Sequence, residues 1–236
     1  MKSEKKYWQQ NFNDEKVVAS AEDLQINIAR TKKGVRISDS DWIKTLEYIK
    51  ELIEFSSDHY ILELCCGNGV IIGELSKKCK VAVGVDYSEI LLNQLKSQFN
   101  NESLKCYHAD VLEFSYKGRS FDSVIIYFSI QHFSPSETIK LVEKALSVLK
   151  PGGSLLIGDV PDEDKKWQYI NKPKYIKDFY SRTLNGNPKI GFWFKKDFFL
   201  NMKYYFEGID IKAISQPLYQ INSDHCFDIL IKKSYD

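Results

Sequence analysis

Residues 60–69 read YILELCCGNG, and this stretch decides the fold. Its first five residues form a short, mostly apolar run, and Gly67 and Gly69 permit a tight turn directly after it. Residues 41–55 before the run and 70–77 after the turn have apolar side chains at helical spacing. A strand, a glycine turn and a helix in this order indicate one unit of a parallel α/β sheet.

The same alternation continues along the chain. Further strands are predicted over residues 81–85, 104–108, 123–128 and 154–158, with helices over 88–99 and 135–149. The Lys-Pro-Gly-Gly sequence of residues 150–153 predicts a turn before the last of these strands.

After residue 158 the alternation lapses, and Pro161, Pro173 and Pro188 are expected to interrupt any long element. A helix over residues 196–206 and strands over 208–215 and 226–232 are predicted to close the sheet. We therefore expect one domain over residues 1–236. Within it, residues 1–40 would form an N-terminal cap and residues 159–205 an insertion that covers a bound substrate.

The composition is that of an ordinary globular protein, and the formal net charge is +1. That charge gives no reason to expect a nucleic acid or an anionic membrane as partner, and no apolar run is long enough to span a bilayer. The five cysteines match no disulfide or zinc pattern. We expect a cytoplasmic protein with reduced thiols, no bound metal and a small-molecule partner.

Three acidic residues lie at the ends of consecutive predicted strands. Glu63 precedes the glycine turn, Asp86 ends the second strand and Asp110 follows the third. Open α/β sheets bind ligands at this edge. A dinucleotide-binding loop would read G-x-G-x-x-G, whereas here the third glycine is absent. A carboxylate at Glu63 repels a pyrophosphate and suits a cationic amine, which argues against NAD.

The runs ILELCCGNG, VGVDYS, HADVLEF, FDSVIIYFSIQHF and LKPGGSLLIGD occur in this order within residues 41–160. Together they resemble the class I S-adenosylmethionine-dependent methyltransferases. The resemblance implies an α/β, Rossmann-like fold: a seven-stranded, mostly parallel sheet whose last strand is antiparallel, with helices on both faces. It also implies S-adenosylmethionine as cofactor.

The resemblance implies a set of cofactor-binding residues: Glu63, Cys65, Gly67, Gly69, Asp86, Tyr87, Asp110, Val111 and Tyr127. Glu63 and Gly67 would lie near the methionine part and Asp86 at the ribose. Tyr87 would pack on the adenine, and Asp110 with Val111 would contact its edge. Cys65 departs from the family, which usually has glycine there.

His132 is the candidate catalytic base, because the loop after the fourth strand borders the methyl group in this family; a structural role is the alternative. Candidate acceptor-binding residues are Asp159, Trp167, Tyr180, Arg182 and Trp193. Tyr7 and Trp8 resemble an aromatic cover over the cofactor.

We expect methyl transfer to oxygen or nitrogen of a small polar metabolite. The alternatives are an inactive cofactor-binding or regulatory module and an NAD-dependent oxidoreductase. A nucleic-acid methyltransferase acting on an amino group would be expected to carry an Asp/Asn-Pro-Pro-aromatic motif where residues 129–132 read SIQH. Binding of S-adenosylhomocysteine separates the methyltransferase fold from the oxidoreductase.

Overall fold

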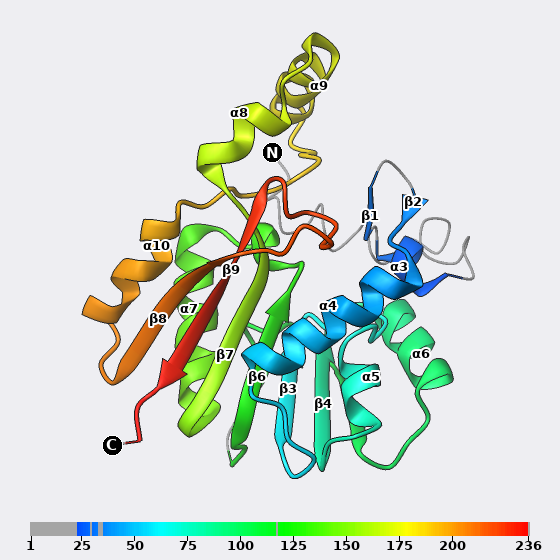
Figure 1. Cartoon of the computed structure of the whole chain (residues 1–236), viewed down its shortest axis with the longest axis vertical. Coiled ribbons are helices and arrows are strands. Elements are labelled where there is room, and N and C mark those ends of the chain that lie inside the picture. Colours follow the sequence, from blue (N-terminus) through cyan, green and yellow to red (C-terminus); the bar gives the residue numbers. More distant parts are fainter. Residues whose placement is uncertain (1–22, 29, 33–34, 117, 236) are drawn as a thin grey trace.

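The computed structural model describes residues 23–28, 30–32, 35–116 and 118–235. Its centre is a seven-stranded sheet with the order β5-β4-β3-β6-β7-β9-β8 (Figure 1). The strands are β3 Tyr60–Leu64, β4 Val81–Asp86, β5 Leu104–His108, β6 Phe121–Tyr127, β7 Leu149–Pro161, β8 Ile209–Ser215 and β9 Cys226–Lys233. Two further short strands, β1 Thr31–Lys32 and β2 Val35–Arg36, pair antiparallel in the N-terminal segment.

The direction of the strands agrees with the predicted fold class. β3 pairs parallel with β4 and β6, β4 with β5, and β6 with β7. β9 lies between β7 and β8 and is antiparallel to both. The predicted antiparallel last strand is therefore confirmed.

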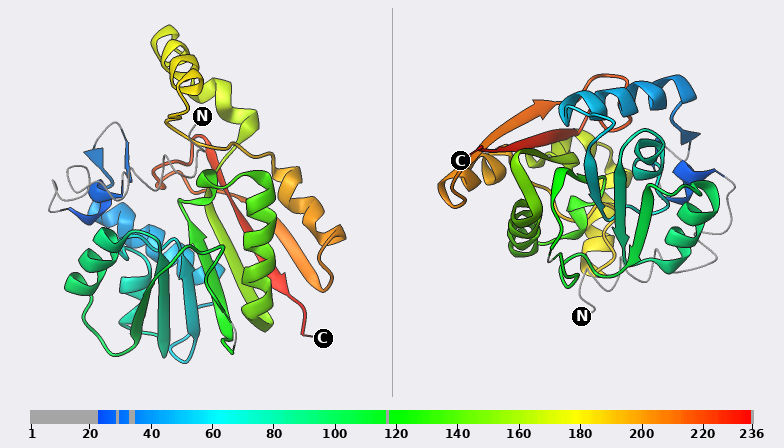
Figure 2. Two further views of the ribbon diagram at one scale, coloured as in Figure 1. Left: turned by 180° about the vertical axis from the view of Figure 1, so that it is seen from behind. Right: turned by 90° about the horizontal axis from the view of Figure 1, so that it is seen from below.

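Helices cover both faces of the sheet (Figure 2). The helices that pack on the sheet are α4 Asp39–Leu52, α5 Ile72–Ser76, α6 Glu89–Gln98, α7 Pro135–Val148 and α10 Lys196–Leu200. Buried side chains of α4, α5 and α6 pack on one face in a single apolar cluster, and those of α7 and α10 pack on the other. Successive residues of β3 alternate between these clusters, since Ile61 belongs to the first and Leu62 to the second.

Local sequence signals fix the helix starts next to the sheet. Ser88 accepts a hydrogen bond from the Leu91 amide and caps α6, as predicted from its position. Ser134 and Glu137 form a reciprocal capping box at α7, with Pro135 in its first turn. These caps fix where α6 begins after β4 and where α7 begins after the loop that follows β6.

Two predictions about the less regular parts were wrong. Proline was expected to prevent a long element in residues 159–195, yet α9 runs over Pro173–Leu184, because proline is tolerated in the first turn of a helix. The turn predicted over residues 150–153 is part of β7, which starts at Leu149 and pairs with Phe121 before its register shifts. Gly152 adopts a positive φ of 73° at this irregularity.

The insertion after β7 also contains a short α8, Lys166–Tyr169, and α8 and α9 together project beyond the carboxyl edge of the sheet (Figure 1). Within the described residues, no helix has the length and apolar content that a bilayer crossing requires. Tyr7 and Trp8, like all of residues 1–22, lie outside the described part of the chain.

Candidate active site

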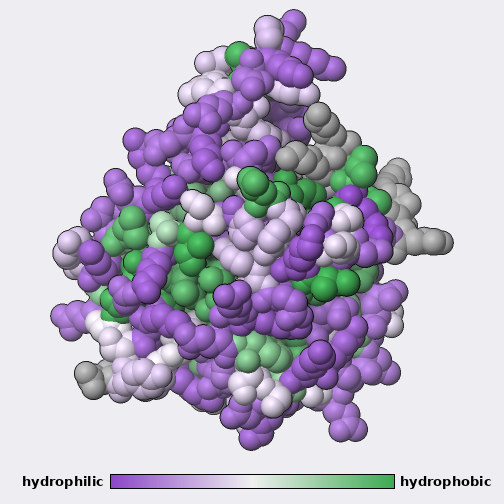
Figure 3. All heavy atoms as spheres, in the orientation of Figure 1, coloured by the Kyte–Doolittle hydropathy of each residue, from purple (hydrophilic) through white to green (hydrophobic). Residues whose placement is uncertain are grey.

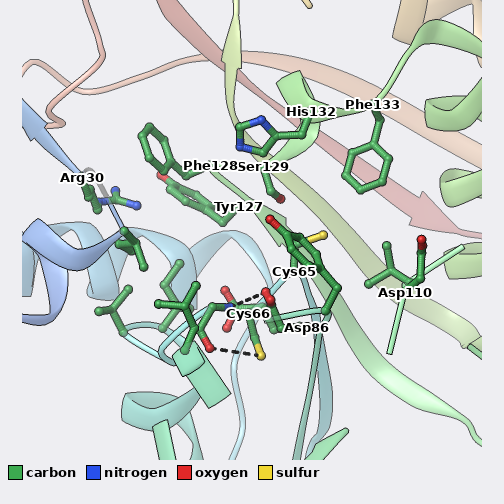
Figure 4. Close-up of a pocket in the computed structure, with 18 residues that line it drawn as sticks. Arg30, Cys65, Cys66, Asp86, Asp110, Tyr127, Phe128, Ser129, His132 and Phe133 are labelled. Atoms are coloured by element: carbon green, nitrogen blue, oxygen red, sulfur yellow. Dashed lines mark hydrogen bonds between the residues drawn. The ribbon is translucent and has the colours of Figure 1, made fainter. Parts of the chain in front are cut away.

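A pocket opens where the carboxyl ends of β3, β4, β5 and β6 meet (Figure 4). The N-terminal segment before α4 contributes to one side of it. The lining residues are Ile28, Arg30, Glu63, Cys65, Cys66, Gly67, Val70, Ile71, Asp86, Tyr87, Leu91, Asp110, Val111, Tyr127, Phe128, Ser129, His132 and Phe133. The structure thus brings together eight of the nine predicted cofactor-binding residues and the predicted catalytic residue.

Asp86 organises the glycine turn. One oxygen of its buried carboxylate accepts a hydrogen bond from the Gly67 amide at 2.8 Å, and the other accepts one from Ser88 at 2.8 Å. Burial raises the pKa of Asp86 to about 6, against the opposing effect of these two amides. Each carboxylate oxygen retains a lone pair, so Asp86 can accept two further hydrogen bonds from neighbouring hydroxyl groups.

The backbone of the turn is left-handed at two lining residues, Gly67 with φ of 52° and Cys65 with φ of 59°. Glycine adopts this conformation without strain, whereas a cysteine there carries a steric cost. The departure of Cys65 from the family pattern therefore falls on a position whose geometry favours glycine. Burial raises the pKa of its thiol, so the side chain is neutral.

Glu63 lies below the turn, and its carboxylate accepts a hydrogen bond from the Ile72 amide at 2.9 Å. Burial raises the pKa of Glu63 to about 8, with the neighbouring Asp86 charge acting in the same direction. A cationic group in the pocket would stabilise the ionised form. Glu63 is therefore suited to an ammonium group and unsuited to a phosphate.

Gly69 does not line the pocket. A Cβ atom at this position would lie 2.5 Å from side-chain atoms of Leu95 on α6, and its φ is 77°. Glycine at residue 69 is therefore required by the turn and by the packing of the turn against Leu95 of α6.

The adenine-facing residues predicted from the sequence lie together on the far side of the turn. Asp110 accepts a hydrogen bond from the Leu112 amide at 2.9 Å, which fixes its carboxylate at the start of a turn. The Tyr87 carbonyl lies 2.8 Å from Nε2 of His108, a contact that fixes the chain after β4. Val111 is buried beside them.

The loop after β6 forms the opposite wall, with Phe128, Ser129, His132 and Phe133 (Figure 4). His132 ends the short 3₁₀ helix Ile130–His132, and burial lowers its pKa to about 3. The imidazole is therefore neutral throughout the physiological pH range. It can accept a hydrogen bond but is a weak base in the empty pocket.

Arg30 is the site residue that the sequence analysis missed. Its side chain is 1% exposed, and its guanidinium lies 4.9 Å from the ring centroid of Trp42 and 5.0 Å from that of Tyr127. Within the described residues, its Nε and Nη2 atoms have no hydrogen-bond partner. A buried guanidinium whose N–H groups are not used by the protein is suited to bind an anionic group. No local motif marks Arg30, because only tertiary packing brings it to the pocket.

Asp159 was predicted as an acceptor-binding residue, but it lies behind Arg30 and not on the pocket lining. Its buried carboxylate lies 3.7 Å from Arg30 Nη2 and accepts a hydrogen bond from Gln216 at 2.8 Å. Its amide donates to Asp228 at 2.9 Å, and Gln216 also donates to Asp228 at 2.7 Å. Asp159 has a left-handed φ of 57°, so this network holds a strained residue in place.

The other acceptor-binding candidates are spread over the insertion and do not line the pocket. Trp167 on α8 and Tyr180 on α9 are 51% and 55% exposed, and Arg182 forms an ion pair with Asp178. Trp193 lies closer, because the adjacent Phe192 amide donates to the Gln131 carbonyl of the loop after β6. Their roles in acceptor binding stay predictions.

The charges and shape of the pocket fit S-adenosylmethionine. Arg30 offers unused N–H groups for a carboxylate, Glu63 suits an ammonium, and Asp86 can accept from ribose hydroxyls. At Gly67 a Cβ atom would lie 3.4 Å from Ile28, so the absence of a side chain keeps this approach open. An acidic, mostly apolar cavity also suits a sulfonium cation.

Comparisons with known proteins agree with this site. Residues 61–153 match the model of a methyltransferase domain family. The ubiquinone/menaquinone biosynthesis C-methyltransferase of Wigglesworthia glossinidia brevipalpis is 29% identical over 177 residues, 72% of this chain and 67% of that protein. Ubiquinone biosynthesis O-methyltransferases of Coxiella burnetii are 25% identical over 126 residues, 52% of this chain and 53% of theirs. The match thus spans about half the length of the latter relatives.

Solved structures share the fold. Magnesium protoporphyrin IX methyltransferase from Synechocystis PCC 6803 with bound S-adenosylmethionine aligns over 99% of both chains, with a TM-score of 0.64 and 11% identity. The plantazolicin methyltransferase BpumL in complex with S-adenosylhomocysteine aligns over 97% of this chain and 96% of its own, with a TM-score of 0.60 and 14% identity. The chain thus contains a match to a methyltransferase domain over residues 61–153, and its fold is that of the class I S-adenosylmethionine-dependent methyltransferases.

Proposed function

We propose that the protein transfers a methyl group from S-adenosylmethionine to an oxygen or nitrogen atom of a small molecule whose reacting end is polar. The observation that carries this proposal is the convergence of Arg30, Glu63 and Asp86 on one pocket, opposite a wall that contains Ser129 and His132. In this proposal the first three residues hold the cofactor and the wall holds the acceptor.

When bound, S-adenosylmethionine supplies an electrophilic methyl group on a sulfonium, which an acceptor attacks in line. The contribution of the chain is then mainly positional. Arg30 donates hydrogen bonds to the carboxylate of the methionine part, Glu63 accepts from its ammonium, and Asp86 accepts from the ribose hydroxyls. The buried, mostly apolar lining excludes water from the reacting atoms.

His132 orients the acceptor in this proposal. Its neutral imidazole can accept a hydrogen bond from an acceptor hydroxyl or amine and so aim a lone pair at the methyl group. With a pKa near 3, the imidazole is too weak a base to take the proton of a ground-state hydroxyl. Positioning of the acceptor is therefore its main role. Trp193, beside the same loop, is the residue of the insertion best placed to contact the acceptor.

The relatives named above methylate carbon in one case and oxygen in the other, and thus leave the accepting atom open. A screen of small hydroxyl- and amine-containing acceptors, read out by release of S-adenosylhomocysteine, tests the proposal. We expect turnover with at least one small acceptor and a lower kcat in His132→Ala, with cofactor affinity retained. Methyl transfer confined to protein or RNA acceptors would contradict it. Cofactor binding without turnover on any acceptor class would favour an inactive binding module.

A further inference from the structure

The α8–α9 projection presents apolar side chains that the rest of the chain does not cover. None of the twelve residues of α9 is buried, although the helix is strongly amphipathic. Its ring contacts are with α8, where Trp167 lies 5.5 Å from Phe179 and 6.3 Å from Tyr180 between ring centroids. A helix of this length gains little stability on its own in water, so contact with a partner would stabilise it.

Three of the exposed apolar side chains of α8 and α9 make up what we call the apolar edge: Trp167, Tyr180 and Leu184. Tyr180 and Leu184 are four residues apart and therefore lie on the same face of α9. The exposed fractions are 51% for Trp167, 55% for Tyr180 and 87% for Leu184. Tryptophan and tyrosine are the side chains that favour the boundary between water and lipid.

The same segment is basic, in contrast to the rest of the chain. Residues 171–190 contain five basic residues and the single acid Asp178, whereas the other 216 residues contain 28 basic and 31 acidic residues. Arg182 pairs with Asp178. The four remaining cations of the segment are exposed lysines, Lys172, Lys174, Lys177 and Lys189. Figure 3 shows this end of the molecule as mostly hydrophilic.

We infer that α8 and α9 dock the protein on an anionic phospholipid surface. The apolar edge enters the boundary between headgroups and acyl chains, and the lysines contact the anionic headgroups. Because α8 follows the carboxyl end of β7, the docking surface lies at the edge of the sheet where the pocket opens. Docking would thus bring the pocket near the bilayer. This inference departs from the expectation, based on net charge alone, that the protein has no membrane partner.

The charge and the apolar edge together favour a bilayer over other partners. A nucleic acid would use the lysines but would leave Leu184 uncovered. A second copy of this chain would bring the basic segments of two α9 helices into proximity, which like-charge repulsion disfavours. An anionic bilayer satisfies both features, and its binding does not depend on the cofactor or the acceptor.

Co-sedimentation with vesicles tests the inference. We expect the full chain to bind vesicles of equimolar phosphatidylcholine and phosphatidylglycerol and not vesicles of phosphatidylcholine alone. Binding should weaken as salt rises from about 0.1 M to about 1 M, because the Debye length falls from roughly 10 Å to roughly 3 Å.

Two sets of variants locate the surface. Reversing Lys172, Lys174 and Lys177 to glutamate should weaken binding by at least about a hundredfold, since each lysine near an anionic surface contributes roughly fivefold. The charge-matched control reverses Lys78, Lys203 and Lys212, which are exposed elsewhere, and should retain most of the binding. Tyr180→Ser with Leu184→Ser should also weaken binding, whereas Leu218→Ser, at a residue 96% exposed, should not.

Retained binding of S-adenosylhomocysteine shows that each variant is folded. The inference is overturned if wild type ignores anionic vesicles, if it binds both vesicle types equally, or if the control set loses as much binding as the α9 set. It is also overturned if light scattering shows a dimer that the apolar-edge variants dissociate, or if RNA competes fully with vesicles for the same lysines.

Discussion

Arg30 Nη2 lies 3.7 Å from Asp159 Oδ2, and both side chains are excluded from solvent. The two atoms are close enough for strong attraction but do not form a hydrogen bond. The Arg30 charge is therefore stabilised by Asp159 while its N–H groups stay available on the pocket side. Gln216 and the Asp228 carboxylate hold Asp159 from behind, and burial raises the pKa of Asp228 to about 6, with the Asp159 charge adding to the effect.

Arg30→Met should weaken binding of S-adenosylhomocysteine by roughly ten- to a hundredfold, because a charge-assisted hydrogen bond to the carboxylate is lost. Binding of 5′-methylthioadenosine, which lacks the amino acid part, should change little. Calorimetry on both ligands makes the comparison. Arg36→Met, an exposed arginine of the same segment, is the control. Equal losses for both ligands would show that Arg30 supports the fold and does not contact the carboxylate.

Asp86→Asn should weaken binding of S-adenosylhomocysteine and of 5′-methylthioadenosine alike, by roughly ten- to a hundredfold. The amide nitrogen of asparagine would oppose one of the two backbone amides, of Gly67 or Ser88, that Asp86 accepts from. Asp122→Asn at the start of β6, where the carboxylate pairs with Lys150, should leave both affinities unchanged. Unchanged binding in Asp86→Asn would contradict the proposal that Asp86 binds the ribose.

Cofactor affinity should depend on pH through Glu63. Its raised pKa of about 8 means that the carboxyl is mostly protonated in the empty pocket at pH 7 and must release its proton to pair with an ammonium. Affinity should therefore rise with pH between about 6 and about 8, and level off above the pKa of Glu63 in the free protein.

Titration of the ligand amine opposes this rise near pH 8, so the measurement is the difference between wild type and Glu63→Gln. Calorimetry in buffers of different ionisation enthalpy should show proton release on binding to wild type that is reduced in the variant. The same pH dependence in both proteins would contradict the pairing of Glu63 with the ammonium.

The pH profile of kcat should lack an acid limb from His132 between pH 5 and 7, because burial places the pKa of His132 near 3. His132→Asn should lower kcat by roughly ten- to a hundredfold through lost positioning of the acceptor, with little change in cofactor affinity. A wild-type acid limb near pH 6 that disappears in the variant would instead identify His132 as a titrating base.

Two of the four strands that end at the pocket were predictable to the residue, since β3 and β5 begin and end where the sequence indicated. Each is a short run bounded by residues that favour turns, and this local signal was sufficient. The predicted bounds of β4 and β6 differ from those observed by one or two residues at an end. The meeting of Glu63, Asp86 and Asp110 at one pocket was also predictable, because parallel strands present their carboxyl ends at one edge of the sheet.

The predictions that failed concern residues whose role depends on the surrounding structure. Pro173 was taken as a helix breaker, although the same residue begins α9. Arg30 could not be assigned, because the side chains that hold it at the pocket are more than ten residues away in the sequence. They are the rings of Trp42 and Tyr127 and the carboxylate of Asp159. Long-range packing of this kind leaves no periodic or spacing signal in the sequence.

A calorimetric titration of the purified chain with S-adenosylhomocysteine tests the central claim most directly. We predict saturable binding of one equivalent, displaced by S-adenosylmethionine and unaffected by an excess of NAD. A titration without heat or saturation, or one in which NAD displaces the ligand, would contradict the account.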